Sequence, residues 1–228
     1  MKSTIPNAAT CPDILYTEML AAIEKTAEDI FENARGSHDW EHTRRVITLS
    51  RTIGRAEGAD MDVVIAGACL HDIGRCGPDG SNGKICHAQK GEVMAAEVLN
   101  DFGISEEKKA AIRHCIAAHR FRRPPEPATL EAKVVFDADK LDAIGAVGVA
   151  RAYLFAGELG AKLHNPDIDV TTVAAYSKED TGYREYIVKL QRIKERMKTA
   201  TGRQMAEARH GFMEAFFERF LAEYGGEM

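Results

Sequence analysis

Residues 63–72 read Val-Val-Ile-Ala-Gly-Ala-Cys-Leu-His-Asp, an uncharged run that ends in two ionisable side chains. Most other segments of the chain repeat apolar residues every three or four positions, so this run predicts a buried helix. His71 and Asp72 follow that helix into the interior, where an unpaired polar group is costly in free energy. They therefore need partners from other parts of the chain.

A second acidic stretch, residues 137–142, reads Asp-Ala-Asp-Lys-Leu-Asp and follows an apolar run. On a helix, Asp139 and Asp142 lie near one face, one turn apart, whereas Asp137 and Asp139 do not share a face. Carboxylates this close repel one another unless a cation neutralises them. Together with eight histidines, six of them between residues 38 and 119, they predict a divalent metal with nitrogen and oxygen ligands: Mn, Fe, Co, Ni or Mg.

Three short motifs follow one another: Asp-Trp-Glu-His-Thr-Arg-Arg-Val at residues 39–46, His-Asp-Ile-Gly-Arg at 71–75 and Asp-Ala-Asp-Lys-Leu-Asp-Ala at 137–143. This order resembles the HD-domain superfamily of metal-dependent phosphohydrolases, and the resemblance covers about residues 35–160. It is closest to small stand-alone bacterial and archaeal members, some of which are similar to nucleotide pyrophosphatases or phosphatases. The resemblance implies one metal site made of His42, His71, Asp72 and Asp139. The other His-Asp pair, His38-Asp39, is expected to cap a helix.

Members of this superfamily that bind two metals carry further histidines, and His87 and His114 occupy comparable places here. The resemblance implies these two as ligands of a candidate second ion, bridged by Asp72. Gly91, one turn after His87, would let another backbone approach closely. His119 follows His114 by five residues, about 140° around a helix, so both serve one ion only if the helix ends between them. We expect His119 to contact substrate or transfer a proton, with a helix-end cap as the alternative.

Basic side chains next to these motifs are candidate phosphate ligands. Lys140 follows the implied ligand Asp139, and Arg45 and Arg75 each lie three residues after a motif residue. We expect Lys140, Arg45 and Arg75 to bind the substrate. The alternatives are a salt bridge within the acidic cluster for Lys140 and charge balance for the two arginines.

The expected function is metal-dependent hydrolysis of a small phosphate ester or phosphoanhydride, above all a nucleotide. Asp72, His87 and His119 are the expected catalytic residues, with His87 or His119 protonating the leaving oxygen. Two alternatives stay open. Some HD-domain proteins are di-iron oxygenases with a similar ligand set. A metal-stabilised helical module without enzymatic activity would instead use its C-terminal helices, about 180–224, as a partner or dimer interface.

Helical periodicity in nearly every segment predicts an all-α fold, an HD-domain-like helical bundle with an additional C-terminal helical pair. Helices are expected at about 13–33, 38–57, 60–76, 87–102, 105–119 and 129–158, the last broken near Gly145 or Gly148, followed by the pair. We expect a single domain, with an HD core at about 35–160 and a C-terminal extension at about 172–226. The loop Cys76–Cys86 directly follows the His-Asp motif and is placed to act as a lid.

Composition narrows the partners. The 228 residues carry a net charge of -5, which disfavours binding to duplex nucleic acid, since such binding depends on clustered basic residues. Five cysteines without a C-x-x-C pair indicate free thiols rather than a disulfide framework. With no apolar leader or span in the sequence, we expect a cytoplasmic protein without a membrane partner, which binds a small phosphorylated substrate and forms a candidate homodimer.

Overall fold

The computed structural model describes residues 12–31, 39–75, 87–120 and 124–228, and within these ranges the chain is helical, without strands. The elements are α1 (Pro12–Phe31), α2 (Trp40–Glu57), α3 (Met61–Leu70), the 3-10 turn η1 (Ile73–Arg75), α4 (His87–Asn100), α5 (Glu106–Ala118), α6 (Leu130–Asp142), α7 (Gly145–Glu158), α8 (Gly182–Val188), the 3-10 helix η2 (Leu190–Arg196) and α9 (Ala200–Gly225). The all-helical expectation is confirmed. His38 and the loop Cys76–Cys86 lie outside the described residues.

Helix α3 is the buried helix that its composition predicts. Asp60 caps its first turn by accepting from the backbone N–H of Asp62 at 3.0 Å, and every residue from Val63 to Leu70 is buried. Helices α1, α2, α5 and α6 pack around it. The α-helix ends at Leu70, earlier than the expected end near residue 76, and the chain then turns through η1.

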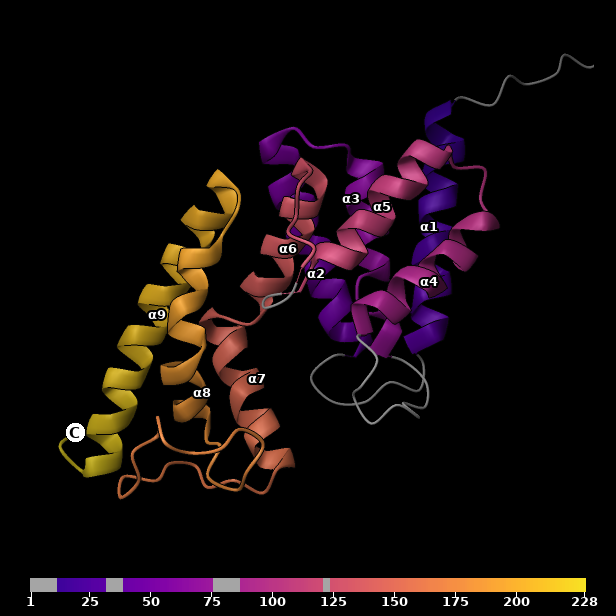
Figure 1. Cartoon of the computed structure of the whole chain (residues 1–228). Helices are drawn as coiled ribbons and strands as arrows, with labels where there is room; N and C mark the ends of the chain where they lie inside the picture. Colours follow the sequence, from indigo (N-terminus) through magenta and orange to yellow (C-terminus); the bar gives the residue numbers. More distant parts are fainter. Residues whose placement is uncertain (1–11, 32–38, 76–86, 121–123) are drawn as a thin grey trace, which may run out of the picture.

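Figure 1 shows two groups of helices. Helices α1, α3, α4 and α5 lie together on one side, α7, α8 and α9 lie together on the other, and α2 and α6 run between them. Helix α9 contacts α2, α6 and α7. The metal-ligand motifs all fall on the first group and on the elements between the groups.

Helix α6 is separated from α7 by a sharp turn at Gly145, which has φ +78°. A side chain is strained in this backbone conformation, and a Cβ would also meet the Arg209 side chain at 3.0 Å. The expected break near Gly145 or Gly148 is thus confirmed at Gly145. Helix α6 ends at Asp142, and α7 begins at Gly145.

Asp137 joins α6 to the start of α9. Its carboxylate accepts from the backbone N–H groups of Lys198 and Thr199, each at 2.8 Å, and from the Thr199 hydroxyl at 2.7 Å. Thr199 is itself the N-cap of α9. Asp137 therefore satisfies backbone donors at the beginning of the C-terminal helix and points away from the other two aspartates of its motif.

The segment before α9 differs from a regular helix. Its apolar residues Tyr186, Leu190, Ile193 and Met197 are buried, but the α-helix stops at Val188 and continues as the 3-10 helix η2. Spacings of three and four residues fit both helix types, so the pattern predicted burial without fixing the hydrogen bonding. Among the described helices, none is both long enough and apolar enough to cross a bilayer.

Candidate metal centre

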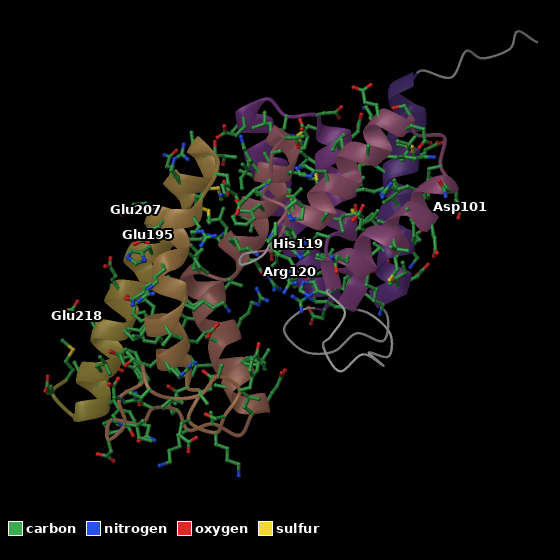
Figure 2. The ribbon with its side chains drawn as sticks, viewed as in Figure 1. Asp101, His119, Arg120, Glu195, Glu207 and Glu218 are labelled. Carbon is green, nitrogen blue, oxygen red and sulfur yellow. The ribbon has the colours of Figure 1, made fainter. Side chains whose placement is uncertain are left out.

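The sequence motifs converge where several helices begin or end. His42 lies in the first turn of α2, whose N-cap Asp39 accepts from the His42 backbone N–H at 3.0 Å, as expected. His71 and Asp72 follow the end of α3, Asp139 lies in the last turn of α6 and His119 follows α5. Figure 2 shows His119 near the middle of the molecule, between the two groups of helices.

The four residues implied as one metal site lie together and are buried. The Nε2 atoms of His42 and His71 are 3.3 Å apart. Nε2 of His42 is 3.5 Å from Oδ1 of Asp139, and Asp72 Oδ2 is 3.8 Å from Nε2 of each histidine. Two atoms that each lie about 2.1 Å from one ion are about 3.0 Å apart at a right angle and about 3.4 Å apart at a tetrahedral angle. The spacing therefore fits a shared ion after small shifts.

Two imidazoles, those of His71 and His119, are each held by a backbone carbonyl with Nε2 toward Asp72. Nδ1 of His71 lies 2.8 Å from the carbonyl oxygen of Ala68, and Nδ1 of His119 lies 2.6 Å from that of Ile116. Because a carbonyl only accepts, Nδ1 is the donor and Nε2 keeps its lone pair. Both rings bond the carbonyl three residues earlier, in the last turn of a helix.

His42 is oriented by a carboxylate instead. Its Nδ1 lies 2.7 Å from Oδ2 of Asp142. Arg45 donates to Asp142 Oδ1 at 2.7 Å, and Arg151 donates to Oδ2 at 2.6 Å. Such a carboxylate behind a metal-binding histidine fixes its tautomer and raises its basicity. The sequence placed Asp142 near Asp139 but gave no role to Asp142 or Arg151; the one-turn spacing from Asp139 was the available signal.

A second group of potential ligands adjoins the first. Oδ1 of Asp72 lies 3.3 Å from Nε2 of His119 and 3.8 Å from Nε2 of His87, so Asp72 presents one oxygen to each group. All three side chains offer ligand atoms within 4.8 Å of one another. The backbone contact expected at Gly91 explains the position of His87: a Cβ on Gly74 of η1 would lie 2.5 Å from the Gly91 nitrogen.

His114 lies apart from both groups. Its Nε2 accepts the backbone N–H of Ala128 at 3.0 Å. Helix α5 ends at Ala118, which turns His119, and not His114, toward Asp72. The structure thus places His119 where the sequence reasoning had expected His114, and it also gives His119 the helix-end cap that was the alternative.

The basic residues are paired with the acidic ones. Lys140 Nζ lies 2.5 Å from Asp139 Oδ2, and Arg75 Nε lies 2.9 Å from Asp72 Oδ2. Both therefore border the centre. Arg45, by contrast, donates its described side-chain hydrogen bonds to Asp142. Asp142 lies on the side of His42 that is turned away from the centre. A substrate-binding role for Arg45 stays a prediction.

Burial and charge set the protonation states that a cation needs. Burial lowers the pKa of His71 to about 4, and burial together with Arg75 lowers the pKa of His87 to about 3. Burial alone would raise the pKa of Asp139, but the positive charge of Lys140 holds it well below its usual value. His71 and His87 are thus neutral and Asp139 is ionised at neutral pH, a nitrogen and oxygen donor set that suits a divalent ion of intermediate hardness.

Comparison with known proteins gives concordant results. Residues 39–144 match the model of the HD domain family. The chain is 35% identical over 208 residues to the protein YpgQ of Bacillus subtilis (strain 168), covering 90% of this chain and 93% of YpgQ. The crystal structure of B. subtilis YpgQ in complex with ADP superposes with a TM-score of 0.72 and 31% identity over 92% of this chain and 96% of that chain. That of an HD-superfamily hydrolase from Bacillus thuringiensis gives 0.73 and 28% over 92% and 98%.

Proposed function

This chain belongs to the HD-domain family, and on that premise we propose that it is a metal-dependent phosphohydrolase that acts on a nucleotide. The observation that carries the proposal is the convergence of the His42 and His71 Nε2 atoms with Asp72 and Asp139. A buried group of this composition, with its rings held in one tautomer, is built to hold a cation. Its relative YpgQ was crystallised with ADP, which supports a nucleotide as the ligand class.

In this proposal His42, His71, Asp72 and Asp139 hold one divalent ion. When bound, such an ion supplies Lewis acidity toward a phosphoryl oxygen and lowers the pKa of water. Lys140 lies at the edge of the centre, 13% exposed, and its ammonium can bind phosphoryl oxygens while it neutralises Asp139.

His119 is the residue we assign to proton transfer. Its Nδ1–H is held by the Ile116 carbonyl, so Nε2 is the atom that can give or take a proton next to Asp72. His87 lies beside it, with ring centroids 5.5 Å apart, and is the second candidate for that role. Asp72, which contacts every histidine of the centre, completes the proposed catalytic set.

Turnover of nucleotides by metal-stripped protein tests this proposal. We expect release of phosphate or pyrophosphate after addition of Mn²⁺, and no release in a chelator. Asp72→Ala should abolish turnover and reduce metal content, whereas Asp101→Ala, an exposed aspartate far from His119 in Figure 2, should match the unchanged protein. Retained turnover with unchanged metal content in Asp72→Ala would contradict the assignment.

Metal analysis, oxygen uptake and stability measurements on the same protein distinguish the two alternatives, a di-iron oxygenase and a helical module without enzymatic activity. A di-iron oxygenase would contain iron after anaerobic purification and show substrate-dependent oxygen uptake. A module without enzymatic activity would gain stability from metal and turn over no substrate of the panel. Either result in place of phosphate release would overturn the proposed hydrolysis.

A further inference from the structure

The guanidinium of Arg75 lies between Asp72 and His87. Its Nε is 2.9 Å from Oδ2 of Asp72, and its Nη2 is 3.1 Å from Nε2 of His87. A guanidinium only donates hydrogen bonds, so Nε2 of His87 is the acceptor. The lone pair that a metal ion would need from His87 is therefore directed at Arg75.

Among the histidines, this arrangement engages only His87 of the second group; the Asp72 oxygen that Arg75 contacts, Oδ2, is the one that faces His42 and His71. Nε2 of His42 and Nε2 of His71 face one another at 3.3 Å without an arginine between them, whereas the group of Asp72, His87 and His119 contains the Arg75 contact. We propose that the Arg75 guanidinium takes the place of a second cation at His87 and thereby limits this centre to one divalent ion. The inference rests on the metal site of the proposed function and adds its stoichiometry.

The backbone holds Arg75 in this place. It is the last residue of η1, and its N–H donates to the carbonyl of Asp72 at 2.9 Å. Gly74, the residue before it, packs so closely on the first turn of α4 that a Cβ would lie 2.0 Å from the carbonyl oxygen of His87. Arg75 and His87 therefore lie on two backbone segments that are in contact. The Arg75 guanidinium is in this way close to both the Asp72 carboxylate and the His87 ring.

The charge of Arg75 supports the same conclusion. It brings one positive charge to Asp72, the carboxylate shared by both groups, and a divalent ion at His87 would be repelled by it at short range. Removing that charge frees the His87 lone pair and leaves Asp72, His87 and His119 as a neutral-nitrogen and carboxylate set of the kind that binds such ions.

Metal stoichiometry and Mn²⁺ electron paramagnetic resonance test the inference without reference to turnover. The unchanged protein should bind one Mn²⁺ per chain, with the spectrum of an isolated ion. Arg75→Gln, which keeps hydrogen-bonding capacity but loses the charge, should bind two, with the dipolar broadening of a close pair. Adding His87→Gln to Arg75→Gln should return the count to one.

Two further variants serve as controls. Arg113→Gln removes an arginine of α5 that pairs at 2.7 Å with Glu92 of α4, the helix that carries His87, and this variant should keep one ion. Arg75→Lys keeps the charge and should also keep one ion, which preserves a test if Arg75→Gln does not fold. Two ions in the unchanged protein, or one ion in folded Arg75→Gln, would overturn the inference while leaving the proposed hydrolysis intact. Absence of any bound ion in the unchanged protein would overturn both.

Discussion

Nδ1 of His42 lies 2.7 Å from Oδ2 of Asp142, so a buried carboxylate fixes the ring nitrogen that is turned away from the metal centre. Arg45 and Arg151 hold that carboxylate from two other helices. Burial alone would raise the pKa of Asp142, but the hydrogen bonds of His42 and Arg45 keep it well below its usual value. The side chain therefore stays an acceptor at neutral pH.

Replacing Asp142 tests this orientation. Asp142→Asn keeps the size of the side chain but removes the charge that favours Nδ1–H on His42, and it leaves two arginines without their counter-ion. We expect Mn²⁺ affinity to fall by roughly 10- to 100-fold, measured by calorimetry on folded protein. Asp101→Asn, on an exposed residue, is the control. Equal affinity in Asp142→Asn and unchanged protein would show that His42 needs no such support.

Asp137→Ala should uncouple stability from metal binding. The substitution leaves the buried backbone donors of Lys198 and Thr199 without their acceptor, and we expect the free energy of unfolding to fall by about 3 kcal/mol. Mn²⁺ affinity should stay within about twofold, because Asp137 belongs to neither group of ligands, an order-of-magnitude expectation from the lack of shared partners. Asp139→Ala is the matched comparison and should lose metal affinity. Loss of metal binding in a folded Asp137→Ala would contradict this division.

Gly74→Ala should separate η1 from α4. A Cβ at this position would lie 2.0 Å from the carbonyl oxygen of His87, so the two backbones must move apart, at a cost of about 1 to 3 kcal/mol. Thermal unfolding measures the loss. Gly157→Ala, in α7 with nothing within 4 Å of its Cβ, is the control and should be unchanged or more stable by up to about 1 kcal/mol. Equal stability of the two variants would refute the close approach.

The metal-free protein should lose stability in acid through His71. Its pKa is about 4 in the folded chain, lowered from 6.5 by burial, so the unfolded ring takes up a proton first as the pH falls. The contribution is complete above pH 6.5, declines as the pH falls toward about 4 and amounts to about 3 kcal/mol. Urea unfolding in a chelator should show the gap between unchanged protein and His71→Gln narrowing by this amount from pH 7 to pH 4. A gap that does not change with pH would contradict it.

Much of the centre follows from the local sequence. The uncharged run that ends in His71 predicts a buried helix, and α3 is buried over all eight residues from Val63 to Leu70. Gly145 marks the turn between α6 and α7, and Gly91 marks the place where the backbone of Gly74 approaches α4. These features depend on side-chain chemistry, on the positive φ that glycine adopts easily at position 145, and on the absence of a Cβ at position 91, all of which can be read from the chain.

The choice between His114 and His119 was beyond such reasoning. It depends on where α5 stops, and Ala118 gives no strong signal for an end. The ring of His119 completes that end by bonding the Ile116 carbonyl, three residues earlier, and its Nε2 then lies 3.3 Å from Asp72 Oδ1. His114 faces Ala128 instead.

The sequence by itself determined that this protein is all-helical and that one buried helix leads into His71 and Asp72. It also indicated that the third motif, residues 137–143, carries a further acidic ligand. Helical periodicity and burial are properties of single segments, so they can be read along the chain. Only the tertiary structure decided that Asp137 caps α9, that Asp139 faces His42 and that Asp142 holds the same ring from behind. Those contacts join atoms of different helices, and their crossing is set by packing across the whole core rather than by any one segment.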